Sequence, residues 1–225
     1  MFKAIAFDLD DTLLDTSGIL VPRASVDAFN ILISAGLKLN LHDCENKRLE
    51  IIKTYSHREV FLHLAQHFGS SLTVDAVPEA IKAFYEPSIP THLPLLPGAL
   101  KNIQYLKNKY RLYLVTAGVD SIQRKKAEAL GIASEFEKIY VTNSLLKEKK
   151  AKTFLEIIKN QNIKTQELLC IGNSLQSEIV DALKIGATAC YFEFGEDRGF
   201  VSTLDSEKPQ FHIRHHDELI PTCKL

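Results

Sequence analysis

The feature that most constrains this chain is an apolar run, residues 2–7 (FKAIAF), that leads directly into the carboxylates Asp8, Asp10 and Asp11. Its β-branched and aromatic side chains predict a buried parallel strand. Acidic residues are depleted in strands, so we expect the carboxylates at the carboxyl end of this one, where open α/β sheets bind ligands. Side chains two residues apart point the same way along extended backbone, so Asp8 and Asp10 can face one point.

Two facing carboxylates repel each other unless a cation lies between them or one of them holds a proton. Carboxylate and carbonyl oxygens are the ligands that Mg²⁺ prefers, and a carboxylate can also act as a nucleophile toward phosphorus. Asp8 and Asp10 are therefore candidates for a metal site and for covalent catalysis. An isolated D-x-D is more simply a solvated acidic turn, so the rest of the chain has to supply further motifs.

Strand and helix patterns alternate along most of the chain. Apolar, strand-like runs cover residues 111–116, 138–141, 167–171, 187–192 and 210–214. Such alternation predicts an α/β fold with a doubly wound parallel sheet. Residues from about 26 to 87 show only helical patterns. We therefore expect a core domain formed by residues 1–16 and 94–225, with an all-helical domain inserted at residues 17–93.

The expected insert contains four helical segments, at residues 26–33, 45–55, 57–68 and 75–85. Ser56 is expected to cap the third helix at its N-terminus, with Glu59 completing a capping box. Pro78 is compatible with the first turn of the fourth helix.

The sequence D-L-D-D-T-L after an apolar strand resembles motif I of the haloacid dehalogenase (HAD) superfamily. The resemblance implies a Rossmann-type core and a helical cap, inserted after motif I, that closes over the active site and selects the substrate. It assigns the nucleophile to Asp8 and the general acid and base to Asp10. Members that dehalogenate 2-haloacids lack the second carboxylate, so Asp10 favours a phosphatase.

A second strand ends in Thr116-Ala117-Gly118. A hydroxyl and backbone N–H groups at a strand end suit a phosphate oxygen, and the following helix N-terminus adds a favourable dipole. The run resembles HAD motif II, which implies that Thr116 and the amides of Ala117 and Gly118 bind the substrate phosphate. The family pattern continues downstream at Gln123, Lys126, Gly131 and Phe136.

Four lysines lie between residues 147 and 152. A lysine run is usually a solvated helix start, but the HAD resemblance places one phosphate-binding lysine here, beside the nucleophile. A cation next to Asp8 would lower the pKa of that carboxyl and offset charge on the transferring group. The resemblance to one HAD subgroup, in which an E-K pair is followed by an aromatic residue five positions after the lysine, favours Lys149. Alignment to ungapped family members favours Lys150, which is the second choice. Lys147 and Lys152 are expected to be surface charges.

A further strand ends in G-N-S-L-Q-S-E at residues 172–178. HAD motif IV is typically G-D-x-x-x-x-D, and its acids coordinate Mg²⁺. The resemblance therefore implies a Mg²⁺ site formed by Asp8, Asp10, Asn173 and Glu178. Asn173 replaces an acid and removes one formal charge, so we expect weaker Mg²⁺ binding. A strand, turn and polar helix cap without metal is the alternative interpretation. The acidic loop at residues 193–199 is expected to border the site.

Taken together, the motifs predict a Mg²⁺-dependent phosphohydrolase that acts on a small phosphomonoester through an aspartyl-phosphate intermediate. Two alternatives remain: a phosphomutase of the same fold would share all four motifs, and Asn173 and Glu178 would also suit a phosphate-binding protein with weakened catalysis.

Charge and composition narrow the classes of partner that the protein is expected to bind. A net charge of −1 argues against a nucleic-acid surface, and no apolar run is long enough for a membrane span. The chain shows no signal-peptide pattern and no C-x-x-C among its four cysteines, so we expect a cytoplasmic protein without disulfides. We expect a monomer or homodimer that binds a small-molecule phosphate ester. His212, His215 and His216 fit no zinc signature and are expected to form a surface cluster.

Overall fold

The computed structural model describes residues 1–143, 146, 148–196 and 208–225. The chain forms two compact units. The first, called the core unit here, consists of Met1–Thr16 and Ile89–Leu225, and the second, the helical insert, is Ser17–Ser88. The division expected from the sequence placed residues 89–93 in the insert, whereas they belong to the core unit.

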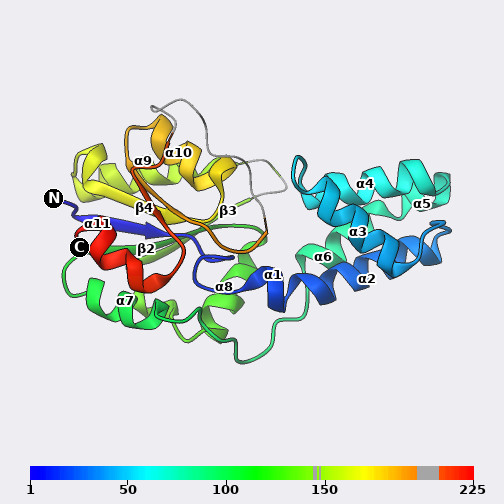
Figure 1. Ribbon diagram of the computed structural model, residues 1–225, viewed down its shortest axis with the longest axis horizontal. Coiled ribbons are helices and arrows are strands. Elements are labelled where there is room, and N and C mark those ends of the chain that lie inside the picture. The colour runs from blue at the N-terminus through cyan, green and yellow to red at the C-terminus, as the bar shows by residue number, and fades with distance from the viewer. Residues whose placement is uncertain (144–145, 147, 197–207) are drawn as a thin grey trace. The chain divides into compact units, whose positions relative to one another are not determined.

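The core unit is built on a six-stranded sheet in which every strand pair is parallel. The strands are β1 (Ala4–Phe7), β2 (Arg111–Ala117), β3 (Lys138–Thr142), β4 (Leu168–Gly172), β5 (Thr188–Phe192) and β6 (Phe211–Ile213). Their order across the sheet is β3-β2-β1-β4-β5-β6. Figure 1 shows these strands between two layers of helices, so the predicted doubly wound α/β fold is confirmed.

Strand β1 occupies the point where the chain changes direction across the sheet. It pairs with β2 on one side and β4 on the other, and Phe7 is in register with both Leu114 and Ile171. The Asp8 amide also donates a hydrogen bond to the Ile171 carbonyl, 2.9 Å from N to O. The residues that follow β1 therefore emerge between the carboxyl ends of β2 and β4, where open α/β sheets bind their ligands.

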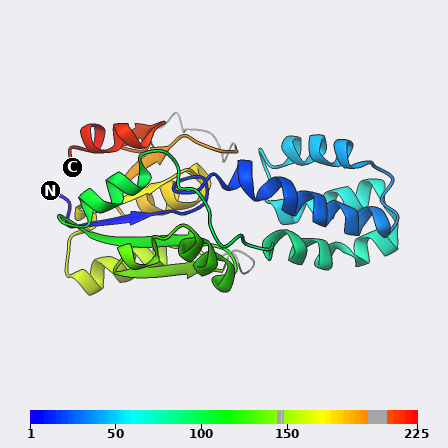
Figure 2. The same ribbon diagram turned by 90° about the horizontal axis from the view of Figure 1, so that it is seen from below.

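Both faces of the sheet are covered by helices. The helices of the core unit are α7 (Ala99–Leu106), α8 (Asp120–Ala129), α9 (Lys150–Gln161), α10 (Val180–Lys184) and α11 (Leu219–Cys223). On one face, Phe154 and Ile157 of α9 and Ala182 of α10 pack against the small side chains Ala4 and Ala6. Helices α7 and α11 lie on the opposite side of the sheet (Figures 1 and 2). Burial on both faces explains why β1 is apolar at every position.

Short helical turns connect these elements: the 3₁₀ turns η1 (Ala133–Glu135), η3 (Thr165–Glu167) and η6 (His216–Glu218), and a π-helical turn, η4 (Leu175–Ile179). Turn η4 directly precedes α10 and carries Glu178. Such π-helical turns are rare and often occur at functional sites.

The helical insert is held together by an aromatic core of its own. Its helices are α2 (Val21–Ser34), α3 (Leu41–Ile51), α4 (His57–Phe68), α5 (Ser71–Asp75) and α6 (Val77–Tyr85), with α1 (Thr16–Ile19) at the junction to the core unit. Phe61 meets both Phe29 and Phe84 edge-on, with ring centroids 6.0 and 5.3 Å away. His57 stacks on Phe84 at a centroid distance of 4.4 Å.

The helix boundaries of the insert show which local signals were reliable. The capping box is confirmed, because Ser56 Oγ accepts from the Glu59 amide and Glu59 Oε2 accepts from the Ser56 amide. The fourth expected helix, residues 75–85, corresponds to α6, whereas the short helix α5 before it was not expected. Pro78 lies in the first turn of α6, as expected.

Candidate active site

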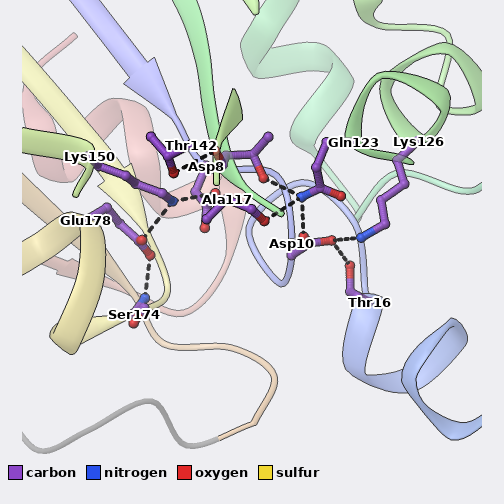
Figure 3. Close-up of polar contacts among 11 residues, drawn as sticks. Asp8, Asp10, Thr16, Ala117, Gln123, Lys126, Thr142, Lys150, Ser174 and Glu178 are labelled. Atoms are coloured by element: carbon purple, nitrogen blue, oxygen red, sulfur yellow. Dashed lines mark hydrogen bonds and ion pairs between the residues drawn. The ribbon is translucent and has the colours of Figure 1, made fainter. Parts of the chain in front are cut away.

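The candidate active site lies at the carboxyl end of the sheet. Asp8 follows β1, and Thr116 is the penultimate residue of β2. Asn173 follows β4, and Lys150 is the first residue of α9. Figure 3 shows the side chains of Asp8, Lys150 and Glu178 on one side of this region and those of Asp10, Gln123 and Lys126 on the other. The two groups have different partners and different environments.

Asp8, Lys150 and Glu178 form a buried charge cluster. Lys150 Nζ lies 2.8 Å from Asp8 Oδ1 and 2.9 Å from Glu178 Oε2. The second oxygen of Glu178, Oε1, accepts from the Ser174 amide at 2.6 Å. A side chain at position 172 would overlap Glu178, since a Cβ there would lie 2.3 Å from Glu178 Cγ, and this explains why Gly172 precedes the turn.

Burial and ion pairing act in opposite directions within this cluster. Burial raises the pKa of Asp8 to about 7, although the neighbouring Lys150 ammonium favours the ionised form. Burial disfavours the charge on Lys150 as well, but the carboxylates of Asp8 and Glu178 outweigh it and raise the pKa of Lys150. Lys150 therefore stays positively charged, and a further positive charge near Asp8 would favour the carboxylate form of a nucleophile.

The geometry reverses the preference between the two candidate lysines. Lys149 is exposed and occupies the N-cap position of α9, where its side chain makes no capping bond. Lys150, the second choice, is buried and reaches Asp8. Asp181 of α10 fixes the start of α9, because its Oδ2 accepts from the Ala151 amide at 3.2 Å. Lys147 lies outside the described residues, as do residues 197–199 of the loop that was expected to border the site.

Asp10 lies in a network of three donors. Its Oδ1 accepts from Thr16 Oγ1 at 2.5 Å and from Lys126 Nζ at 2.7 Å, while its Oδ2 accepts from Gln123 Nε2 at 2.7 Å. Gln123 and Lys126 are buried side chains of α8, one helical turn apart. Burial works against the charged form of Asp10, but Lys126, Thr16 and Gln123 together lower its pKa below the ordinary value.

The groups of the predicted phosphate-binding run at the end of β2 differ in their hydrogen-bond partners. Thr116 is buried, and its Oγ1 accepts from Gln123 Nε2 at 2.6 Å, which leaves the hydroxyl hydrogen available for a phosphate oxygen. The Ala117 carbonyl also accepts from Gln123 Nε2, at 3.1 Å. The Gly118 amide, however, donates to the Thr142 carbonyl at 2.9 Å, so it is already paired in this arrangement.

The four predicted metal ligands differ in how strongly protein groups already hold them. Each oxygen of Glu178 accepts from one protein donor, and the ion pair with Lys150 holds this side chain on the Lys150 side of the site. Asn173 is buried, and its Nδ2 donates to the Phe194 carbonyl at 3.2 Å, which orients the side-chain amide. Within the described part of the chain, no three His, Cys, Asp or Glu side chains are grouped to hold a metal.

The remaining donors nevertheless fit Mg²⁺. They are the second carboxylate oxygen of Asp8, the backbone carbonyl of Asp10 and the side-chain oxygen of Asn173. All three are hard oxygen ligands, and Mg²⁺ commonly keeps several waters and takes only one or two carboxylates. The set has one carboxylate, so its attraction for a cation is weaker than that of a site with three.

The contacts of three residues with Asp10 were not predicted from the sequence. Gln123 and Lys126 were noted as part of a pattern, but their contact with Asp10 was not expected, and Thr16 was not considered. His216 was expected at the surface, yet it is buried, and its Nε2 donates to the Thr12 carbonyl at 2.8 Å. This bond ties the loop after Asp10 to the C-terminal part of the chain. His212 and His215 are exposed, as expected.

Comparison with known proteins agrees with this geometry. A sequence profile of the haloacid dehalogenase-like hydrolases matches residues 5–191. The chain belongs to this family. It is 27% identical to a glyceraldehyde 3-phosphate phosphatase of Methanopyrus kandleri over all of this chain and 98% of that protein. It is 30% identical to a protein of the same name from Pyrococcus abyssi, over 87% of this chain and 83% of that protein.

Solved structures of the family share the fold. The HAD-hydrolase YfnB of Bacillus subtilis, determined with bound magnesium, has a TM-score of 0.68 and 21% identity, covering 98% of this chain and 97% of that one. A haloacid dehalogenase-like hydrolase of Streptococcus pneumoniae has a TM-score of 0.72 and 19% identity, with the same coverage. These structures confirm the predicted HAD fold, and the family match together with the sequence relatives confirms the predicted enzyme class of HAD-like phosphatase. Among the helices of the described residues, none is long and apolar enough to cross a membrane.

Proposed function

We propose that this HAD-family protein is a Mg²⁺-dependent phosphohydrolase that cleaves a small phosphomonoester through phosphorylation of Asp8. The observation that supports the proposal is that two carboxylates two residues apart have different partners. Asp8 lies in a buried pair with Lys150, while Asp10 is held by Thr16, Gln123 and Lys126. Two neighbouring carboxylates that are held by different partners can take different roles, here those of nucleophile and proton-transfer group.

In the first half-reaction, an oxygen of Asp8 attacks the substrate phosphorus in line with the leaving oxygen. Lys150 lies 2.8 Å from Oδ1 of the same carboxylate and is placed to offset charge on the transferring group. Thr116 offers its hydroxyl hydrogen to a phosphate oxygen. As the ester bond breaks, its electron pair goes to the leaving oxygen, and Asp10 supplies that oxygen with a proton.

In the second half-reaction, water attacks the phosphorus of phosphorylated Asp8. Asp10, which has given up its proton, takes one from this water, and the bond between Asp8 and phosphorus breaks. Inorganic phosphate leaves, and both carboxyl groups return to their starting state, so protons and electron pairs balance over the cycle. Mg²⁺ bound by Asp8, the Asp10 carbonyl and Asn173 would neutralise charge on the phosphoryl oxygens.

A triose phosphate is the first candidate substrate, because the Methanopyrus and Pyrococcus relatives are named glyceraldehyde 3-phosphate phosphatases. The alcohol released from such an ester is a poor leaving group, so its departure depends on proton donation. The network around Asp10 fixes the orientation of the carboxyl group that would supply this proton. Sugar phosphates, nucleoside monophosphates and phosphoglycolate-like acids form the wider panel.

The test is phosphate release from glyceraldehyde 3-phosphate and from an aryl phosphate, with Mg²⁺ and with a chelator. Wild type is compared with Asp8→Asn and with the control Asp27→Asn, which changes an exposed carboxylate of the insert. We expect Mg²⁺-dependent turnover by wild type and the control and none by Asp8→Asn, with acid-quenched mass spectrometry locating phosphate on Asp8. Full activity of Asp8→Asn would contradict the proposal. Transfer of phosphate to a second sugar phosphate would indicate a mutase, and phosphate binding without turnover would indicate a binding protein.

A further inference from the structure

The carboxyl group of Asp10 accepts hydrogen bonds from three side chains, and these bonds fix its orientation. Three donors from two separate elements converge on it: Thr16 at the start of α1, and Gln123 and Lys126 from α8 (Figure 3). Resting on the proposed phosphohydrolase activity, we infer that Gln123 and Lys126 are positioning residues that orient Asp10 so that its Oδ2 exchanges the proton with the leaving oxygen.

Counting acceptor sites leads to the choice of oxygen. A carboxylate oxygen has two lone-pair directions. Oδ1 already accepts twice, from Thr16 Oγ1 and Lys126 Nζ, whereas Oδ2 accepts once, from Gln123 Nε2. With respect to the donors in the described part of the chain, one acceptor direction therefore remains, and it is on Oδ2. A proton carried by Asp10 belongs there: it passes to the leaving oxygen as the ester bond breaks and is replaced from the attacking water.

Helix α8 shows that the two side chains are placed for this contact. Gln123 and Lys126 are three residues apart, so they share one face of the helix, and they are only 2% and 7% exposed. Arg124 and Lys125, between them, are exposed. Burying an ammonium group is costly unless it is paired, and Lys126 is paired with Asp10 across 116 positions of sequence. The contact thus defines the orientation of the carboxylate and of α8 together.

Gln123 also joins the proton-transfer group to the phosphate-binding end of β2. Its Nε2 lies 2.7 Å from Asp10 Oδ2, 2.6 Å from Thr116 Oγ1 and 3.1 Å from the Ala117 carbonyl oxygen. Two hydrogens serve these three acceptors. Gly118, at φ +153°, leaves the space for this side chain, because a Cβ there would lie 3.2 Å from Gln123 Cγ. One amide therefore sets the spacing between the proton-transfer oxygen and the phosphate.

The test uses two aryl phosphate esters that differ in how good a leaving group they release. Phenyl phosphate releases a poor leaving group that needs a proton, whereas 2,4-dinitrophenyl phosphate releases a good one that does not. Misorienting a general acid should slow the first far more than the second, because general acid catalysis contributes about 10²- to 10⁴-fold where it is needed. The variants are Gln123→Met and Lys126→Met, which keep length and remove the donors. The controls are Gln104→Met and Lys125→Met, at exposed positions.

We expect kcat on phenyl phosphate to fall by about 10- to 100-fold in Gln123→Met and Lys126→Met, and kcat on the dinitrophenyl ester to change by less than about threefold. Thermal unfolding, measured on every variant, identifies those that have lost the fold. Equal losses on both esters by folded variants would overturn the inference and leave the phosphohydrolase intact, since they indicate a structural role. Failure of wild type on both esters and on the triose phosphate would remove the proposed function and this inference together.

Discussion

Asp8 and Asp10 are two residues apart, yet the protein surrounds them in opposite ways. Asp8 is buried in the charge cluster with Lys150 and Glu178, and burial raises its pKa to about 7. Asp10 is partly exposed and accepts from three donors, and despite burial Lys126, Thr16 and Gln123 lower its pKa. In the proposed mechanism, this difference separates a nucleophile that depends on a cation from a proton-transfer group that is held in place.

The Asp8 side is the more fragile of the two, because its charged side chains are almost fully buried. Lys150 is the shared partner of Asp8 and Glu178, so its removal leaves two carboxylates facing each other in a dry environment. On the Asp10 side, three donors share the carboxylate, and loss of any one leaves two. Perturbations should therefore have larger effects on the Asp8 side.

The largest effect is expected for Lys150→Met. Breaking a buried ion pair by removing one partner costs about 3–5 kcal/mol, so the free energy of unfolding at neutral pH should fall by that order. Loss of a positive charge beside the transferring group should lower kcat/KM by about 10²- to 10³-fold. Urea unfolding and phosphate release measure the two effects.

The matched control is Lys149→Met, at the exposed N-cap of α9. It should leave both quantities unchanged. If Lys149→Met lost as much activity as Lys150→Met, the assignment of the lysine to position 150 would be wrong. A Lys150→Met/Glu178→Gln double variant separates the two effects of Lys150→Met, because it should regain stability without regaining activity.

The choice between the two lysines also shows a limit of prediction from the sequence. The strands, their ends and the order of the motifs are local properties, and they were predicted well. The choice between Lys149 and Lys150 depends on the residue at which α9 begins, since successive helical side chains point in directions about 100° apart. Helix boundaries are uncertain from sequence by one or two residues, and this uncertainty is enough to exchange two neighbouring lysines.

Contacts between segments that are far apart in the sequence were the second feature that could not be predicted. Asp10 is 113 and 116 positions from Gln123 and Lys126, and His216 is 204 positions from Thr12. The spacing of Gln123 and Lys126 indicates a shared helix face but does not identify the partner of that face. Glu178 occupies the expected motif position, yet only the packing against Gly172 and the reach of its longer side chain bring it to Lys150.

A second prediction concerns the charge of the metal site beside Asp8. Asn173→Asp adds a carboxylate next to an oxygen donor set that has only one, so Mg²⁺ affinity should increase by about tenfold. Calorimetric titration of the resting protein with Mg²⁺ measures this without reference to turnover. The control Asn160→Asp makes the same change at an exposed position of α9 and should leave the affinity unchanged. Equal affinity of Asn173→Asp and wild type would place Asn173 outside the metal site.

A third prediction tests the redundancy of the Asp10 side. Thr16→Val removes one of the two donors to Oδ1 and keeps the shape of the side chain. Lys126 still holds the same oxygen, so kcat on a poor leaving group should fall by only about three- to tenfold, the value of one hydrogen bond. Combined with Lys126→Met, the loss should exceed the product of the single losses, because Oδ1 then has neither donor. Simple multiplication of the two effects would show that the donors act independently.

The smallest effect is expected at His216, which supports the loop after Asp10 through the Thr12 carbonyl. Burial lowers the pKa of His216 below its ordinary value of 6.5, although the bond to Thr12 opposes this shift. The unfolded chain therefore binds a proton at this residue at a higher pH than the folded protein does. Its contribution to stability is complete above pH 6.5 and is lost as the pH falls below that value.

His216→Gln removes the titration and can still donate to the carbonyl. Urea unfolding at pH 7.5 and pH 5.5 should therefore show a smaller loss of stability on acidification in the variant than in wild type, with about 1.4 kcal/mol expected for each pKa unit of the shift. His215→Gln, at the exposed neighbouring position, is the control and should retain the wild-type pH dependence. Identical pH dependence of His216→Gln and wild type would show that this histidine, despite its burial, is not what weakens the loop after Asp10 in acid.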